Sequence, residues 1–326
     1  MIVRRFIWML STLLLGIISC DRALAQDAAY PSKPVRIVVP YPPGAFNDTL
    51  GRLVANKLGA AWNIPVVVEN KPGGGTVIGT QAVAAAPPDG YTVLVVQFPF
   101  ATNLWLYKSL PYDTNSAFSP VLLAGRAPMV LAVNAESPIK SVAQMLEAAR
   151  AKPGKLNYGS SGPGSSNHLA MALFESVSKT ELTQIPYKGS SPMLAGLAGG
   201  QVEFAFDALP HIQPFIEAGK ARALAIASAD RSPLMPELPT FAESGMPNFK
   251  VSSWHGFVVP AGTPQAVIDK LNGELNSILQ MPDVQEIFRR EGVVIDGGTP
   301  GFFREFIATE MEMWKNVILQ NNIVIE

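Results

Sequence analysis

Three glycine- or serine-rich loops have the composition of a site for a small anion. They are PPGAFND (42–48), KPGGGT (71–76) and SSGPGSS (160–166), and each lies between a predicted strand and a predicted helix. The first N–H groups of a helix have no partner within the helix and carry a partial positive charge, so they bind anions without a cationic side chain. Glycine lets a ligand approach the backbone, and serine adds hydroxyl donors. Any one loop could be only a tight turn, but the three together favour a ligand site at the carboxyl ends of strands.

Two aspartates accompany these loops. Asp48 begins a predicted helix, where a carboxylate caps the free amides, and the same position places it beside the first loop. Asp207 ends a predicted strand in the apolar segment FAFDALP. It either contacts a ligand or caps the helix that follows, and the sequence leaves both roles open.

The histidines do not indicate a metal centre. His168, His211 and His255 are the three in the chain, and none lies at ligand spacing from another. A hydrolase that pairs Ser160 or Ser165 with His168 is conceivable, but the chain has no G-x-S-x-G elbow. A histidine that fixes the loop is the simpler interpretation of His168. We therefore expect a binding protein without a metal, and not an enzyme.

Nucleotide-binding motifs are also missing. The run Gly73-Gly74-Gly75 and Gly79 give the spacing G-x-G-x-x-x-G, and no acidic residue follows at the distance that a ribose ligand needs. The chain has no G-x-x-x-x-G-K-[ST] segment, which excludes a P-loop. The sequence thus predicts no cofactor.

The elements that must position the loops alternate along the chain. We expect strands at 35–40, 66–69, 92–97, 129–134, 156–159, 181–186, 202–206, 221–227 and 254–259. We expect helices at 48–58, 77–86, 141–151, 166–177, 192–199, 264–279 and 300–321. Such alternation predicts an α/β fold with parallel sheet.

The number of strands is too large for one compact sheet of ordinary size, so we predict two lobes. The boundary candidates are 125–128 and the proline-rich stretch 232–247. If the chain crosses at both, residues 26–127 together with 253–326 form the first lobe, and residues 128–252 form the second.

The amino-acid composition excludes two classes of protein. The 326 residues are 48% hydrophobic and 16% charged, which excludes a disordered, highly charged chain. The 25 basic and 26 acidic residues leave no basic excess, so we expect no nucleic-acid partner.

The N-terminus is typical of an exported protein. Arg4 and Arg5 precede an apolar run, Phe6–Ile18, and Ala23-Leu24-Ala25 forms an A-x-A cleavage site before Gln26. We predict a signal peptide over residues 1–25. Its removal takes away three arginines and one aspartate, which leaves a net charge of −3.

Cys20 allows a second form of export. The segment Ile17–Cys20 resembles a lipoprotein box, in which the cysteine becomes a lipidated first residue. Cleavage before Gln26 instead removes the one cysteine of the chain, so no disulfide forms. Beyond that point no apolar stretch is long enough to span a membrane.

Many ordered segments resemble the Bug-type receptors of tripartite tricarboxylate transporters. They run from Tyr30 to the C-terminus and are YPSKPVRIVVPYPPGAFND, VVVENKPGGG, PPDGYTVL, LPYD, SSGPGSSNHLA, IPYKG, GGQVEFAFD, GKARALA, PTFAESG, WHG, PAGTP and EMEMW. No single segment is specific, but the set is. The resemblance implies a two-lobed periplasmic binding protein (type II-like), with each lobe a sheet flanked by helices and the ligand in the cleft between them.

The resemblance also implies a small carboxylate ligand held by amides, hydroxyls and waters. The residues that it places in the cleft are Pro43, Gly44, Ala45, Phe46, Asp48, Ser160, Ser161, Gly164, Ser165 and Asp207. The family usually has Gly-Gly where this chain has Gly44-Ala45, and glycine where it has Thr76. The first change affects how closely the backbone of that loop approaches a ligand.

Three functional hypotheses follow. The leading one is a monomeric periplasmic receptor that closes on a carboxylate and delivers it to membrane transporter subunits. The second is the Ser/His hydrolase described above. The third is a receptor of the same kind that reports its ligand to a signalling partner. The sequence leaves open which carboxylate is bound.

Overall fold

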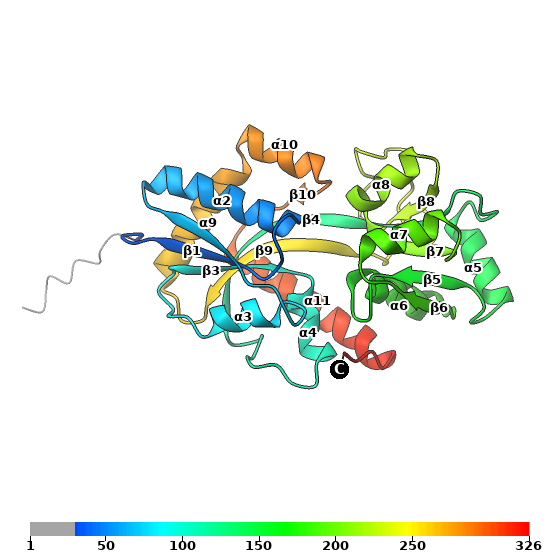
Figure 1. The fold of residues 1–326 in the computed structure, drawn as a ribbon, viewed down its shortest axis with the longest axis horizontal. Helices are drawn as coiled ribbons and strands as arrows, with labels where there is room; N and C mark the ends of the chain where they lie inside the picture. The colour runs from blue at the N-terminus through cyan, green and yellow to red at the C-terminus, as the bar shows by residue number, and fades with distance from the viewer. Residues whose placement is uncertain (1–29, 326) are drawn as a thin grey trace, which may run out of the picture.

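The computed structural model describes residues 30–325 and shows two α/β bodies joined side by side (Figure 1). The predicted signal peptide, Cys20 and Gln26 lie outside this range. The strands are β1 (Val35–Val39), β2 (Val66–Asn70), β3 (Thr92–Gln97), β4 (Phe118–Asn134), β5 (Asn157–Ser160), β6 (Thr183–Pro186), β7 (Phe204–Ala208), β8 (Ala221–Ile226), β9 (Ser252–Pro260) and β10 (Val294–Ile295). The helices are α2 (Phe46–Trp62), α3 (Val77–Ala84), α4 (Pro99–Leu106), α5 (Val142–Ala151), α6 (Ser166–Ser178), α7 (Ser190–Ala198), α8 (Leu209–Glu217), α9 (Gln265–Leu279), α10 (Pro282–Arg290) and α11 (Pro300–Gln320).

Each body is built on its own part of the strand order β2-β1-β3-β9-β4-β7-β5-β6. In the first body, β1 pairs in parallel with β2 and β3, and β9 is antiparallel to β3. In the second body, β5 pairs in parallel with β6 and β7, and β8 pairs with β4. Helices cover both faces of each sheet, as expected for parallel strands that are buried on both sides (Figure 1).

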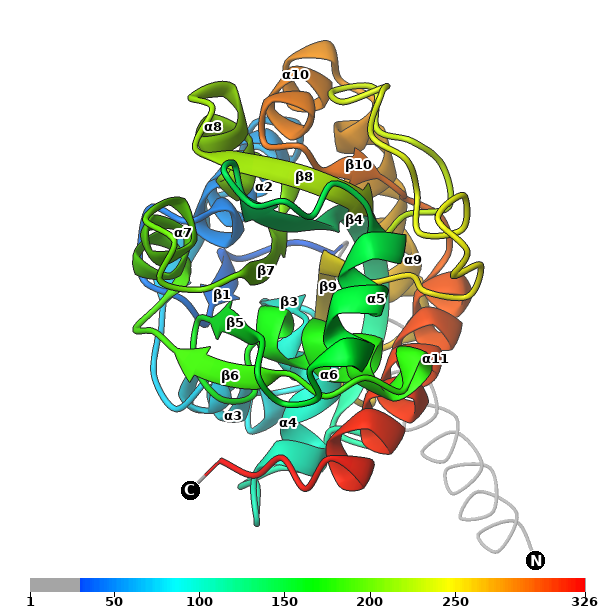
Figure 2. The ribbon, with the colours of Figure 1, turned by 90° about the vertical axis from the view of Figure 1, so that its right-hand side faces the viewer.

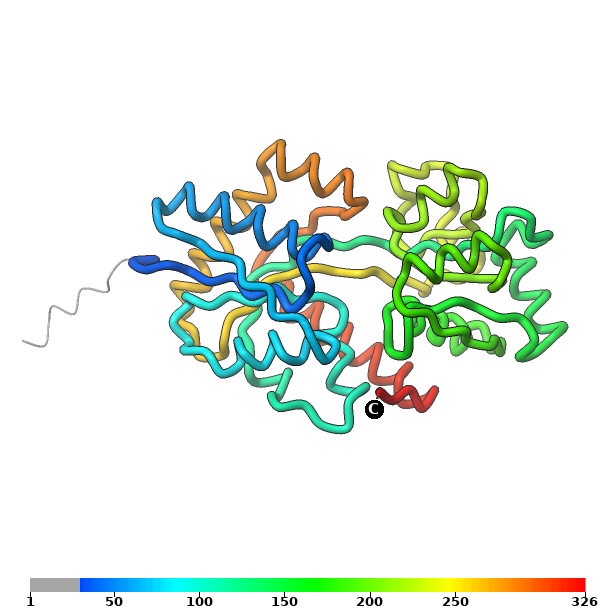
Figure 3. The backbone as a smooth tube through the Cα atoms, in the orientation of Figure 1, coloured from blue at the N-terminus to red at the C-terminus, as the bar shows by residue number. Residues whose placement is uncertain are grey.

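Two strands carry the chain between the bodies (Figure 3). The first part of β4, up to Pro128, pairs with β9, and from Met129 onward β4 pairs with β7 and β8. The chain returns through Ser252, where β9 begins opposite Pro128. The strand β4 therefore changes its pairing partners at the point where β9 begins.

The sequence-based expectation for β4 was too short, because it began the strand at Met129. The segment 125–128 was a boundary candidate because proline and glycine usually interrupt strands. In the structure the register of β4 against β9 shifts between Pro120 and Leu122 and again between Leu123 and Gly125. Such bulges let a strand hold proline and glycine without ending.

Helix α11 packs against both bodies. Its first half buries Phe303 and Ile307 against the first sheet, and its second half buries Trp314 and Ile318 in a core shared with α6 and β7. Figure 2 shows α11 running past α6. Residues from Trp314 onward thus contact the second body as well, although we expected the segment 253–326 to lie in the first.

A buried carboxylate joins α11 to β9. The indole Nε1 atoms of Trp254 and Trp314 both donate to Oε2 of Glu310, each at 3.0 Å. Burial raises the pKa of Glu310 to about 7, even though both indole hydrogen bonds favour the charged form.

Three helices were not expected from the sequence: α4, α8 and α10. Each begins with proline at its first or second position, where the missing N–H costs nothing. Helix α2 also begins at Phe46 and extends to Trp62, beyond the predicted range 48–58.

Candidate functional site

The carboxyl ends of the parallel strands in the two bodies face each other. Gln97, the last residue of β3, pairs with His255 near the start of β9, where the chain arrives from the second body. Ala208, the last residue of β7, pairs with Met129, where β4 enters the second body. Helices α2, α3 and α4 therefore begin at the edge that faces α6, α7 and α8. Open α/β sheets bind ligands at such edges.

The N-terminus of α2 carries free amides. Its N-cap, Ala45, offers no side-chain cap, and the N–H groups of Ala45, Phe46 and Asn47 have no acceptor among residues 30–325. Gly44 just before it has φ +102°, a conformation that favours glycine. A helix end that lacks a cap leaves donors for water or a ligand.

Asp48 holds this loop in shape. Its carboxylate accepts from the Gly44 amide at 3.1 Å, from Arg52 Nε at 3.0 Å and from Asn70 Nδ2 at 2.9 Å. Burial alone would raise the pKa of Asp48, but the hydrogen bonds from Arg52, Asn70 and Gly44 outweigh it and lower the pKa. With 5% of its surface exposed, Asp48 positions the loop and has little area for a ligand.

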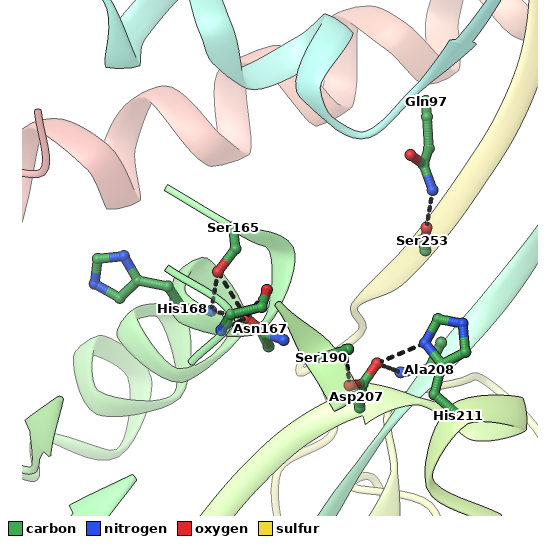
Figure 4. Close-up of polar contacts among 10 residues, drawn as sticks. Gln97, Ser165, Asn167, His168, Ser190, Asp207, Ala208, His211 and Ser253 are labelled. Carbon is green, nitrogen blue, oxygen red and sulfur yellow. Dashed lines mark hydrogen bonds and ion pairs between the residues drawn. The ribbon is translucent and has the colours of Figure 1, made fainter. Parts of the chain in front are cut away.

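A series of hydrogen-bonded polar side chains connects the start of α2 to β3 and β9. Asn47 accepts from His255 Nδ1 at 2.7 Å and donates to Gln97 Oε1 at 3.2 Å. Gln97 Nε2 then donates to Ser253 Oγ at 2.9 Å (Figure 4). Burial lowers the pKa of His255 to about 3, so its ring is neutral. This series fixes the start of α2 against β3 and β9.

The 160–165 loop uses its amides internally. The Asn167 side chain accepts from the Ser161 amide at 2.9 Å and from Ser165 Oγ at 2.6 Å. The Ser165 amide donates to the Gly162 carbonyl at 3.3 Å, and the Gly164 amide donates to His168 Nδ1 at 3.0 Å. We expected these amides to face a ligand, but the structure gives each of them an acceptor within the loop. Ser165 instead caps α6 by accepting from the His168 amide (Figure 4).

The same contacts contradict the hydrolase hypothesis. Ser160 is fully buried, and its hydroxyl accepts from Gln184 at 2.7 Å. Ser165 bonds to the backbone amide of His168 and not to its ring. Burial lowers the pKa of His168 to about 4, and its Nδ1 accepts from Gly164. The loop thus contains no serine activated by a histidine.

Asp207 links two helix N-termini of the second body. Its Oδ1 accepts from the Ala208 amide at 2.7 Å and from His211 Nδ1 at 3.0 Å, and its Oδ2 accepts from Ser190 Oγ at the start of α7 (Figure 4). Only 4% of Asp207 is exposed. The N-cap of α8 is Ala208 and this helix has no side-chain cap, so Asp207 does not cap it in the expected way and instead ties Ser190 to His211.

The 71–76 loop is held by hydrogen bonds from residues at the end of α4. The Gly74 and Gly75 carbonyls accept from Tyr107 and Asn103, which belong to or directly follow α4. Thr76, where glycine was expected, adopts φ +84°. This loop acts as a turn between β2 and α3.

Several residues of the site were not found from the sequence. Asn47, Gln97, Asn167, Ser190 and His211 were given no role in the site. The shared signal is a polar residue in the segment that ends a predicted strand or leads into the next helix, the region where ligand contacts of α/β folds concentrate. Among residues 30–325, no group of three potential ligands could hold a metal ion, and no helix is long and apolar enough to cross a membrane.

Comparison with known proteins decides the family. The model of the family described as "tripartite tricarboxylate transporter family receptor" matches residues 50–323. The chain belongs to this family. It is a solute-binding receptor of the TctC/Bug type, and its relatives are binding proteins and not enzymes. The resemblance seen in the sequence and the periplasmic binding protein fold are thereby confirmed.

Relatives of this TctC/Bug-type receptor cover nearly its whole length. Protein BugT of Bordetella pertussis (strain Tohama I) is 37% identical over 315 residues, with 94% of this chain and 97% of BugT covered. The structure of R. palustris Rpa4515 with adipate is 35% identical with a TM-score of 0.77, covering 91% of this chain and 100% of that one. MatC of Rhodopseudomonas palustris with bound malate is 29% identical with a TM-score of 0.74, covering 89% and 100%.

Proposed function

We propose that this receptor captures a small carboxylate between its two lobes in the periplasm and delivers it, as a monomer, to membrane subunits of a tripartite transporter. The observation that carries the proposal is the uncapped N-terminus of α2, with three free amides at the edge that faces the second lobe. Amides in this arrangement favour an anion. The carboxylates bound to two structural relatives support the same class of ligand.

The proposed site combines the two loops and the residues that shape them. Pro43, Gly44, Ala45 and Phe46 present the amides of the first lobe, and Asp48 orients them. Ser161, Gly164, Ser165 and Asp207 line the opposite wall, and buried Ser160 supports it. On the second wall, hydroxyl groups and the starts of α7 and α8 supply most of the ligand contacts. The amides of the 160–165 loop contribute less, because they already have acceptors.

The two strands that connect the lobes provide the hinge for closing the lobes on a ligand. We propose hinges at Pro128–Met129, where β4 changes its partner from β9 to β7, and near Ser252, where β9 begins. A ligand that contacts both walls binds the closed form better and shifts the equilibrium toward it. The transporter would then recognise the closed form. The predicted signal peptide and the periplasmic relatives support the location.

A thermal-shift screen on ligand-stripped protein tests the proposal. The panel contains adipate, malate, citrate, benzoate, nicotinate and glutamate, with glucose and putrescine as neutral and cationic controls. A carboxylate at 100 times its dissociation constant should stabilise the protein by about 2.7 kcal/mol. Stabilisation by glucose or putrescine, with none by any carboxylate, would contradict the proposal.

A further inference from the structure

The pair formed by Asp207 and His211 has an unused polar atom at the edge facing the first lobe. Asp207 is buried and anchors Nδ1 of His211 at 3.0 Å, whereas 61% of the His211 side chain is exposed. No other residue within 30–325 makes a hydrogen bond to Nε2 of this ring. Asp207 thus fixes the ring through Nδ1, and Nε2 has no hydrogen-bond partner among residues 30–325.

The anchor fixes the tautomer of His211. An ionised carboxylate only accepts hydrogen bonds, so Nδ1 must carry the proton that it donates to Asp207. In the neutral ring Nε2 is then a bare acceptor, which repels the oxygen of an anion. In the protonated ring Nε2–H is a donor, and the positive charge balances Asp207.

The start of α8 is part of the boundary between the lobes. Ala208 packs in the core cluster of the first lobe, with Phe288 and Val293. Pro210 lies so close to Gly292 that a Cβ added at Gly292 would be 2.7 Å from Pro210 Cγ. His211, one residue further along, lies near enough to Glu291 after α10 and to His255 on β9 for its ring to interact electrostatically with both.

We propose that His211, in its protonated form, binds the carboxylate of the ligand through Nε2–H, so that anion capture is coupled to the uptake of one proton. This inference rests on the proposed function and adds a residue and a pH dependence to it. It also assigns Asp207 a purpose: the carboxylate selects the tautomer that makes binding depend on protonation.

The charged groups near the ring agree with this assignment. The hydrogen bond from His211 to Asp207 raises the pKa of His211, and Glu291 beyond α10 raises it further. The positive charge of His211 in turn disfavours protonation of His255 on β9, whose pKa burial has already lowered to about 3. His168 has a pKa of about 4. Of the three histidines, His211 is therefore the one whose pKa is raised, whereas those of His168 and His255 are lowered.

Calorimetric titrations with adipate and malate, followed by the other carboxylates of the panel, test the coupling between pH 5.5 and 9. Above the pKa of free His211, the dissociation constant of the wild type should rise about tenfold per pH unit. His211→Arg keeps a cation at every pH, and His211→Asn keeps only the donor to Asp207. The dissociation constants of both variants should not change with pH, and His211→Arg should bind the carboxylate more tightly than His211→Asn. Glu217→Gln, which changes one charge at the far end of α8, should follow the wild type.

A second readout does not depend on stability. With three histidines in the chain, histidine-labelled protein gives three ring signals, and the His211 signal should titrate at higher pH when adipate or malate is bound. A pH-independent dissociation constant in the wild type, or an unshifted His211 titration, would overturn the inference and leave the proposed function intact. If no carboxylate of the panel binds at any pH, the proposed function itself fails.

Discussion

Replacing Phe46 by proline removes one amide from the proposed anion site without disturbing the helix. Phe46 is the first residue of α2, a position where proline is favoured. Ala45 before it has φ −83° and ψ 165°, an extended conformation that a following proline requires. The Phe46 amide makes no hydrogen bond within residues 30–325, so the fold should lose nothing when it is removed.

The expected loss is that of one charge-assisted hydrogen bond, about 1.5–3 kcal/mol. At 1.4 kcal/mol per factor of ten, the dissociation constant of the bound carboxylate should rise by roughly 10- to 100-fold. Phe46→Ala is the matched control, because it removes the same ring and keeps the amide. The ring packs edge-on against His255 at 4.7 Å and Phe288 at 5.3 Å, so both variants lose the same packing.

The assay is calorimetric titration of both variants with the carboxylate that binds the wild type most tightly, with circular dichroism to check the fold. We expect Phe46→Pro to bind at least tenfold more weakly than Phe46→Ala. Equal affinities in two folded variants would refute the reasoning that the α2 amides hold the ligand.

Three further predictions concern stability, metals and export. Burial raises the pKa of Glu310 from 4.5 to about 7, so in this range the folded protein binds a proton that the unfolded chain has released. The free energy of unfolding should therefore fall as the pH rises from about 4.5 to 7. Glu310→Gln should remove about 1–2 kcal/mol of this loss. Equal free energies of unfolding of the wild type at pH 5 and pH 8, measured with urea, would contradict this prediction. Chelation with EDTA should leave carboxylate affinity unchanged, and a loss restored by a divalent metal would show a metal-dependent site. Intact mass should place the mature N-terminus at Gln26, whereas a diacylated Cys20 would favour the lipoprotein alternative.

Local patterns in the sequence were enough to predict most elements of the fold. The strand β3 has the predicted bounds, and Ser141 caps α5 through the Gln144 amide, as its spacing indicated. Such features depend on neighbours along the chain. The proline-containing elements were missed for a different reason. Proline usually interrupts a helical pattern, but Pro210 stands in the first turn of α8, where its missing N–H costs nothing, and Pro214 lies inside the helix.

The polar contacts of the site depend on the tertiary fold and could not be predicted in the same way. The sequence placed the 160–165 loop before a helix but gave no sign that the Asn167 side chain would occupy the Ser161 amide. The series from Asn47 to Ser253 joins residues 206 positions apart, and only the pairing of β3 with β9 brings them together. The contacts of Asp48 with Gly44 and Arg52 are local, but the sequence indicated only a helix-capping aspartate beside the first loop, and the helix begins earlier, at Phe46.

The central claim is that a small carboxylate is held between the two lobes by main-chain donors at the start of α2. A crystal structure of the complex with the tightest-binding carboxylate of the panel tests it most directly. The account predicts carboxylate oxygens within hydrogen-bond distance, about 2.7–3.2 Å, of the Ala45, Phe46 or Asn47 amides, with His211 at the opposite wall. A neutral sugar or a cation in the cleft, or a carboxylate held by an arginine or lysine side chain with the α2 amides left to water, would contradict it.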